Sequence, residues 1–397
     1  MNAKVIGGIL LVVGTSIGGG MLALPIASAT SGFVASSCLL IACWLVMMLP
    51  AFLILEVNLW LPPGTNLISM ARKTLGSVGA GISWISYLLL LYCLISAYIS
   101  SGQDMLGNLL KLAHFSLPAW ANPCIFVAIF SLIVALGIRS VDYVNRGLMS
   151  LKLIAYLLLI VFVITYIKLP NLAHSQPAAL KGSIMVMITS YGLATLVPSL
   201  RAYFKDELQQ LRKVILIGSC IPLVCYLLWN LVVLGSLPLQ GENGLAGMMQ
   251  SSDSTSALVN ALSRELSNDW VTTFVHLFAS ICVLTSFMAV SLGLMDFLAD
   301  GFKTTKQGRS GVLIYFLTFV PPLILVLFYP GLFIKGLAYA GLCCVVLLLL
   351  LPVLMAWRGR YHLQLAGSGY RLWGGKILLL LLLVAAFVVL GVGVSQL

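Results

Sequence analysis

Long apolar stretches alternate with short polar connections along almost the whole chain. An α-helix needs about 20 residues to cross the hydrocarbon core of a membrane, and eleven apolar stretches reach roughly that length. The sequence therefore predicts an all-α membrane protein with eleven transmembrane helices. These spans cover residues 5–29, 34–60, 79–107, 118–138, 148–169, 182–203, 213–237, 270–299, 311–329, 331–356 and 374–396.

The first span contains a run of small residues that disfavours a continuous helix. From Gly14 to Pro25 it consists of Gly-Thr-Ser-Ile-Gly-Gly-Gly-Met-Leu-Ala-Leu-Pro. A glycine costs roughly 1 kcal/mol relative to alanine in a helix interior, and lipid cannot hydrogen-bond to the backbone groups that a break exposes. The predicted break must therefore face protein, water or a ligand. Interrupted helices of this kind are typical of the substrate site of a transporter.

The sixth span carries a second run of small residues before a proline. Gly192 precedes Pro198 by six residues, as Gly19 precedes Pro25 in the first span. Because five spans separate the two starts, the sixth enters the membrane in the opposite sense to the first, as an inverted repeat of five helices requires. Glycine and proline are frequent in transmembrane helices, so packing or a simple kink is the alternative for the sixth span.

The charged residues support the membrane assignment and indicate an orientation. Only 8% of the residues are charged and 61% are hydrophobic, whereas soluble domains average about 25% charged residues. Of the 22 lysines and arginines, 17 fall on the side of the N-terminus and five on the other side. Positive residues concentrate in the cytoplasm, so we expect a cytoplasmic N-terminus, and the net charge of +11 reflects topology rather than nucleic-acid binding.

Other function classes lack the patterns that they require. The nine cysteines form no C-x-x-C pair and the four histidines show no ligand spacing, so we expect free cysteines, no metal and no cofactor. A channel would show a polar stripe or rings of charge, and an intramembrane enzyme would need a nucleophile with a base or a metal cluster. A transporter remains the leading prediction, with a channel or an intramembrane enzyme as remote alternatives.

Six segments of the chain together carry a resemblance to a known family: 14–25, 197–204, 211–219, 221–223, 285–287 and 294–300. They resemble the hydroxy and aromatic amino acid permease family, part of the amino acid–polyamine–organocation superfamily. The resemblance implies the leucine-transporter-type fold in a single transporter domain, 1–397. In this fold two inverted five-helix repeats, here 1–169 and 182–356, are followed by one extra helix, 374–396, and helices 1 and 6 are broken.

What the resemblance implies about activity is import of an aromatic amino acid, tyrosine first, by proton-coupled symport with alternating access. A sodium-coupled symporter of another neutral amino acid is the alternative. The family implies the bacterial inner membrane and a periplasmic C-terminus. Many relatives carry Phe-Gly-Phe-His or Phe-Gly-Tyr-His at the sixth-span break, whereas this chain has Tyr191-Gly192-Leu193-Ala194, so the lining differs there.

The two breaks offer complementary backbone groups for an amino acid zwitterion. Free N–H groups from Ser16 to Gly20 can bind the carboxylate, and carbonyl groups at both breaks can bind the ammonium. The aromatic side chain would lie between helices 1, 3, 6 and 8. On helix 3 the candidates are Tyr92, Ser96, Tyr98 and Gln103, for which a core or interfacial role is the alternative. The expected substrate-binding residues are Thr15, Ser16, Ile17, Gly18, Gly19, Gly20, Ser96, Ser190, Tyr191, Gly192 and Leu193.

Three residues are candidates for ion coupling, and they give conflicting signals. Thr285 and Ser286 resemble the adjacent hydroxyls that bind sodium in the superfamily, whereas Lys152 resembles the lysine that proton-coupled relatives place where the sodium ion sits. Both assignments cannot hold at once. A lysine there would mimic the cation when protonated and release helix 1 when neutral. Snorkelling of the Lys152 side chain to the cytoplasm is the alternative.

Glu56 and the longest external connection complete the set of candidates. Glu56 resembles the helix 2 glutamate that holds the helix 6 break in the superfamily, with pairing to Arg72 and Lys73 as the alternative. In the connection 239–269, apolar residues at helical spacing predict an amphipathic helix. The resemblance makes this connection a lid over the outer vestibule, and a helix lying on the membrane surface is the alternative. The apolar residues are Leu258, Val259, Leu262 and Leu266.

Overall fold

The computed structural model describes residues 3–396 except 113, 115–116, 136–137, 206, 242–243, 250, 252, 267–268, 305–307 and 366–368. These residues form helices joined by short connections, and no strand occurs among them. The α-helices are α1 (Ala3–Ser16), α2 (Gly19–Ser28), α3 (Phe33–Leu59), α4 (Leu67–Leu112), α5 (Ala121–Ala135), α6 (Ile138–Val163), α7 (Leu169–Ala173), α8 (Lys181–Ser190), α9 (Val197–Phe204), α10 (Leu208–Ser236), α11 (Leu245–Met248), α12 (Ser254–Leu266), α13 (Asp269–Gly301), α14 (Gly308–Phe328), α15 (Leu332–Cys344), α16 (Leu351–Tyr361) and α17 (Gly375–Val394).

The expected membrane helices appear close to their predicted bounds. In the described part of the chain, nine helices are long and apolar enough to cross a membrane, or ten when the bent pair α1 and α2 is counted as one span. The span expected over 118–138 corresponds to a shorter apolar helix, Ala121–Val134. An all-α membrane protein is therefore confirmed, while the count of eleven and the inverted repeats stay predictions.

The two predicted breaks take different forms. In the first span, Ile17 and Gly18 separate α1 from α2, Gly18 is extended, and the two segments bend by 52°. In the sixth span, α8 ends at Ser190, a 3₁₀ helix covers Gly192–Leu196, and α9 begins at Val197. Among the described helices only the first span bends by more than 40° at a short break. The sixth span therefore changes its helix type without an equally sharp bend.

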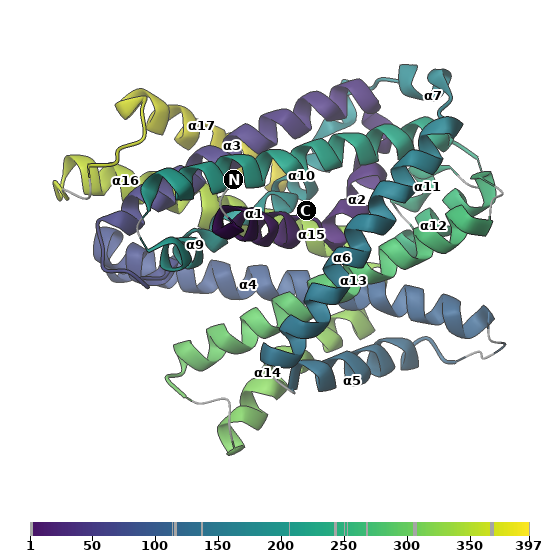
Figure 1. Ribbon diagram of the computed structural model, residues 1–397, viewed down its shortest axis with the longest axis horizontal. Helices are drawn as coiled ribbons and strands as arrows, with labels where there is room; N and C mark the ends of the chain where they lie inside the picture. Colours follow the sequence, from purple (N-terminus) through teal and green to yellow (C-terminus); the bar gives the residue numbers. More distant parts are fainter. Residues whose placement is uncertain are drawn as a thin grey trace.

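The interrupted first span lies at the centre of the bundle (Figure 1). Helices α3 and α10 run side by side, α1 packs against α10, and α2 packs against α8. Helix α4 crosses the bundle and contacts α13, α14 and α15. It is divided at Gly76, whose φ of 83° lies in the left-handed region that glycine adopts without strain. The segment before Gly76 thus forms a separate piece of α4.

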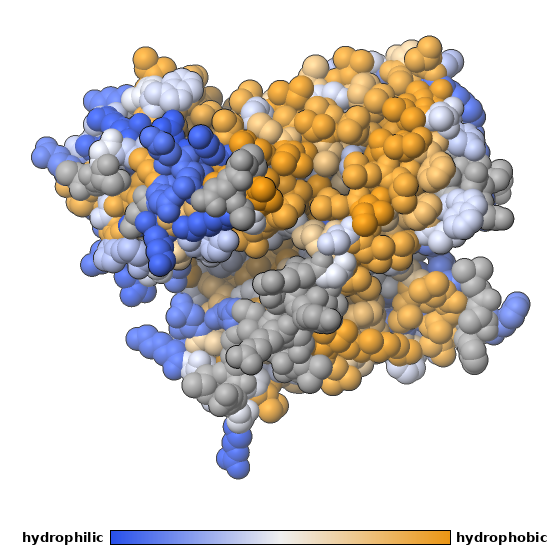
Figure 2. Space-filling view, viewed as in Figure 1, coloured by the Kyte–Doolittle hydropathy of each residue, from blue (hydrophilic) through white to orange (hydrophobic). Residues whose placement is uncertain are grey.

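The molecular surface has the polarity of a membrane protein. Figure 2 shows a broad hydrophobic surface, with hydrophilic residues gathered at the end where α9 and α16 lie. On the opposite end, α12 packs onto the bundle through Leu258, Val259 and Leu262, which are 0%, 2% and 1% exposed. The hydroxyls of Thr255 on α12 and Ser101 on α4 lie 2.8 Å apart. These contacts disfavour the alternative of a helix that lies on the membrane surface, whereas the lid function stays a prediction.

Candidate functional site

The break in the first span exposes backbone donors that its own helix cannot satisfy. The first N–H groups of a helix have no intrahelical acceptor, and α2 starts at Gly19. The Gly19 N–H donates to Ser286 Oγ at 2.9 Å, and the Met21 N–H donates to the Gly18 carbonyl at 3.1 Å. The N–H groups of Gly18 and Gly20 lie at the N-terminus of α2, which is the positive end of its dipole. N–H groups in this position are able to bind an anionic group such as a carboxylate.

A cavity of about 350 Å³ adjoins this break. Cavities that hold small molecules have volumes of about 300–1,000 Å³. Its wall combines the first span around the break, the middle of α4, the sixth-span break and α13, with Met149 of α6 and Leu348 of the tenth span. The four main contributors are helices 1, 3, 6 and 8 in the predicted count. The sequence placed the substrate between these same four helices.

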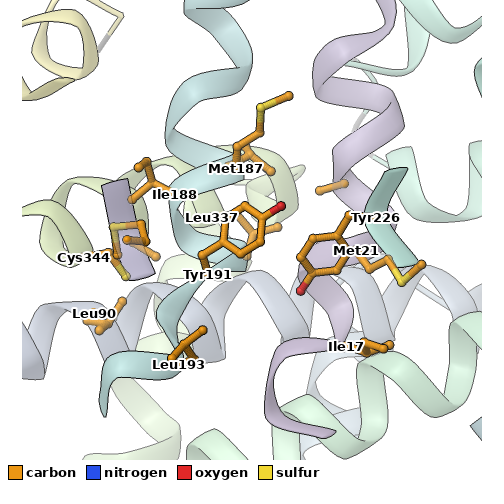
Figure 3. Close-up of a cluster of buried hydrophobic side chains, with 14 of the residues drawn as sticks. Ile17, Met21, Leu90, Met187, Ile188, Tyr191, Leu193, Tyr226, Leu337 and Cys344 are labelled. Atoms are coloured by element: carbon orange, nitrogen blue, oxygen red, sulfur yellow. The ribbon is translucent and has the colours of Figure 1, made fainter. Parts of the chain in front are cut away.

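Most of the residues expected to bind substrate lie on this wall, but Ile17, Gly19, Ser96 and Tyr191 lie outside the lining. Ile17 and Tyr191 are 0% and 1% exposed, and Tyr191 packs edge-on against Tyr226, with ring centroids 5.4 Å apart (Figure 3). Ser96 is buried and its hydroxyl has no hydrogen-bond partner among the described residues. The lining includes Thr15, Ser16, Gly18, Gly20, Ser190, Gly192, Leu193, Thr285 and Ser286.

Part of the apolar wall comes from a helical stripe on α4, of which only Tyr98 was a candidate from the sequence. The stripe consists of Tyr87, Leu91, Leu94 and Tyr98, which follow one another at spacings of four and three residues. Such spacing places them on one face of a helix. The same spacing also occurs in ordinary buried helices, so the pattern alone did not identify a site. Another candidate, Tyr92, faces α14, where its hydroxyl donates to the Leu317 carbonyl at 2.8 Å.

Lys152 on α6 reaches the first-span break. Its side chain is 0% exposed, its Nζ donates to the Ile17 carbonyl, and Nζ lies 3.5 Å from Thr285 Oγ1. No carboxylate pairs with it among the described residues. Snorkelling to the cytoplasm is therefore wrong for this structure. The three candidates for ion coupling meet at one place, because Ser286 accepts the neighbouring Gly19 N–H.

Tyr226 on α10 is a site residue that sequence inspection missed. Its hydroxyl lies 2.6 Å from the Ser16 carbonyl oxygen and 3.0 Å from the Ser190 carbonyl oxygen. Figure 3 shows its hydroxyl directed toward the first-span break near Ile17. A tyrosine within an apolar helix carries no signal of such a role, because only the folded chain brings both breaks to it.

Glu56 has a different partner from either of those expected. It is 1% exposed and accepts hydrogen bonds from Arg360 Nε at 2.7 Å and Arg360 Nη2 at 2.6 Å. The Leu372 N–H donates to the same carboxylate at 2.7 Å. Its hydrogen bonds therefore come from the tenth span and the segment before α17, rather than from the sixth-span break or from Arg72 and Lys73.

Arg201, near the end of α9, makes hydrogen bonds between the second and sixth spans. Its Nη1 donates to the Asn58 carbonyl, lies 3.2 Å from Asn58 Oδ1, and donates to the Leu61 carbonyl at 2.9 Å. The guanidinium group of Arg201 thus binds the backbone at the end of α3. This contact fixes the segment that follows the sixth-span break.

Comparisons with known proteins extend the similarity over nearly the whole chain. A model of the tryptophan/tyrosine permease family matches residues 1–393. Tyrosine-specific transport system 1 of Haemophilus influenzae is 33% identical over 385 residues, 96% of this chain and 94% of that protein. Tyrosine-specific transport system 2 of the same organism is 32% identical over 98% of this chain and 96% of its own. Its tryptophan-specific transport protein is 31% identical, with coverages of 95% and 92%.

Proposed function

Because the chain belongs to the tryptophan/tyrosine permease family, a family of membrane transporters and not of enzymes, we propose that it imports tyrosine by proton-coupled symport. The transport cycle is alternating access in the bacterial inner membrane. The transporter domain consists of eleven spans, with two inverted five-helix repeats, a cytoplasmic N-terminus and a periplasmic C-terminus. Activity of alkaline phosphatase fused to the C-terminus tests this orientation, since the enzyme is active only in the periplasm.

The substrate assignment follows from the chemistry of the cavity wall. The N–H groups of Gly18 and Gly20 are placed for the carboxylate, and the carbonyls of Ser16 and Ser190 for the ammonium. The stripe on α4 supplies an apolar wall for an aromatic ring. Two of the relatives compared above are named as tyrosine-specific, which favours tyrosine over tryptophan.

Competition of labelled tyrosine uptake by all twenty unlabelled amino acids tests the substrate. We expect unlabelled tyrosine to compete best, followed by phenylalanine and tryptophan. Dominant competition by a small aliphatic or acidic amino acid would contradict the aromatic assignment.

The observation that carries proton coupling is the position of the Lys152 ammonium. An ionisable side chain inside the membrane is costly, so an unneeded lysine is disfavoured there. Lys152 Nζ lies between the Ile17 carbonyl and the Thr285 hydroxyl, where a metal cation would find the same oxygen ligands. A protonated Lys152 holds the first-span break and α13 together, and loss of its proton removes the charge that binds them.

The cavity wall also indicates which side is open. It includes Leu11 and Gly14 before the first-span break and Thr195 and Leu196 at the end of the 3₁₀ helix of the sixth-span break. With a cytoplasmic N-terminus, all four lie in the cytoplasmic half of the membrane. This lining supports a state in which the substrate cavity faces the cytoplasm.

Uptake into proteoliposomes tests the coupling ion. We expect wild type to accumulate labelled tyrosine under an imposed pH gradient and not under a sodium gradient. Lys152→Ala should lose accumulation yet still exchange internal for external tyrosine, because exchange needs no net proton movement. Lys168→Ala is the matched control, since Lys168 is an exposed lysine that pairs with Glu265 at 2.5 Å. Sodium-driven accumulation, or full proton-driven accumulation by Lys152→Ala, would contradict the proposal.

A further inference from the structure

Tyr226, on the uninterrupted helix α10, contacts both interrupted spans through one atom. Its hydroxyl lies 2.6 Å from the Ser16 carbonyl oxygen and 3.0 Å from the Ser190 carbonyl oxygen. These residues are the last of α1 and α8. The final carbonyls of a helix have no intrahelical donor and form the negative end of its dipole. Two negative helix ends therefore converge on a single hydroxyl.

One hydroxyl proton cannot satisfy two carbonyl groups at once. A phenol donates a single hydrogen bond, so either Ser16 or Ser190 keeps a free acceptor while Tyr226 binds the other. Both serines lie on the cavity wall, within reach of a bound molecule. An ammonium group matches this position, because it carries three donors and a positive charge. A ligand without an amino group leaves the acceptor unpaired, which is unfavourable in a buried site.

The Tyr226 hydroxyl is held in place from several sides. The residue is 0% exposed and its ring packs edge-on against Tyr191, with centroids 5.4 Å apart (Figure 3). The preceding carbonyl, that of Cys225, accepts a hydrogen bond from the Tyr156 hydroxyl at 2.9 Å. The hydroxyl therefore has little freedom to move away from the two carbonyls.

We propose that Tyr226 is a positioning residue that holds the carbonyls of Ser16 and Ser190 at one point and so makes the permease selective for substrates with a free α-amino group. It acts on the ligand through these carbonyls. The inference rests on the proposed function, because it assumes that the substrate is an amino acid bound between the breaks.

The test compares tyrosine with 3-(4-hydroxyphenyl)propanoate, which lacks only the amino group, in binding to the purified protein. Tyr226→Phe keeps the ring and removes the hydroxyl. We expect it to raise the Kd of tyrosine about tenfold, which corresponds to about 1.4 kcal/mol, and to change the Kd of the deaminated ligand less than threefold. Tyr92→Phe is the matched control, because it also removes a phenol–carbonyl hydrogen bond, the one to Leu317, which lies on the α14 side of α4. It should leave the ratio of the two Kd values unchanged.

Equal weakening of both ligands by Tyr226→Phe, or unchanged binding of both, would overturn the inference. If Tyr226→Phe does not fold, Tyr226→Gln and Tyr226→Leu replace it, because both lack the ring and only glutamine can donate a hydrogen bond. Equal selectivity of these two variants would also overturn the inference. A wild type that binds tryptophan but not tyrosine would refute the proposed substrate alone. The same comparison with tryptophan and 3-(indol-3-yl)propanoate would then test Tyr226.

Discussion

Substitution of Gly19 tests whether the first-span break forms the substrate site. A Cβ atom at this position would lie 2.7 Å and 2.9 Å from two ring carbons of Tyr98, closer than van der Waals contact. Tyr98 is 7% exposed and lines the cavity, so its ring can yield only into the substrate space. Overpacking costs typically about 1–3 kcal/mol, which corresponds to roughly 5–150-fold in affinity. We therefore expect Gly19→Ala to raise the Kd of tyrosine about tenfold and Gly19→Leu to abolish binding.

Tyrosine binding to purified protein in detergent, measured by isothermal titration calorimetry, checks this expectation. Gly81→Ala on α4 is the matched control, because a Cβ there meets no atom within 4 Å. The control should bind tyrosine like wild type, with a small gain in stability from its better helix propensity. Normal tyrosine affinity in a folded Gly19→Leu protein would refute the assignment of the first-span break as the binding site.

Further substitutions test other contacts. Glu56→Gln leaves Arg360 without its counter-charge in an ion pair whose side chains are 2% and 1% exposed. We therefore expect the free energy of unfolding, measured by thermal denaturation, to fall by about 3–5 kcal/mol. Glu207→Gln breaks the exposed pair with Lys4 and should cost under about 1 kcal/mol; equal losses would contradict this. Ser286→Ala removes the acceptor of the Gly19 N–H and should weaken tyrosine binding about fivefold by calorimetry, whereas unchanged binding would show that this contact does not order the site. Leu258→Asp places a charge at the buried face of α12 and should displace this predicted lid. We expect it to increase the labelling of a cysteine introduced by Ala257→Cys from the periplasmic side. Unchanged labelling would contradict the lid function.

The features that follow from the sequence alone are those set by neighbouring residues. The membrane helices appear because transfer into lipid depends on the local run of apolar side chains. The first span breaks at Ile17 and Gly18, within the glycine-rich run that predicted the break. Helix propensity acts residue by residue, so the position of this break needed no knowledge of the fold. The basic residues likewise indicate an orientation without any contact between spans.

Resemblance to a family located the lysine, and the structure supplied its contacts. Lys152 within an apolar helix is equally compatible with snorkelling, because the side chain is long enough to reach the interface. Its burial against the Ile17 carbonyl depends on α6 packing beside a break 135 residues earlier in the chain. A local sequence pattern cannot predict a contact between residues so far apart in the chain.

Tertiary packing alone decided the partners of the remaining polar groups. Glu56 pairs with Arg360 across 304 residues, and the Tyr226 hydroxyl meets Ser16 across 210 residues. Tyr191, which belongs to the sixth-span break in sequence, turns into the core against Tyr226 instead of lining the cavity. Apolar helices of similar composition can pack in many arrangements, so hydropathy does not determine which helices are neighbours. Without water, an unpaired buried polar group is costly, and only the folded arrangement of the helices determines which partner lies within reach.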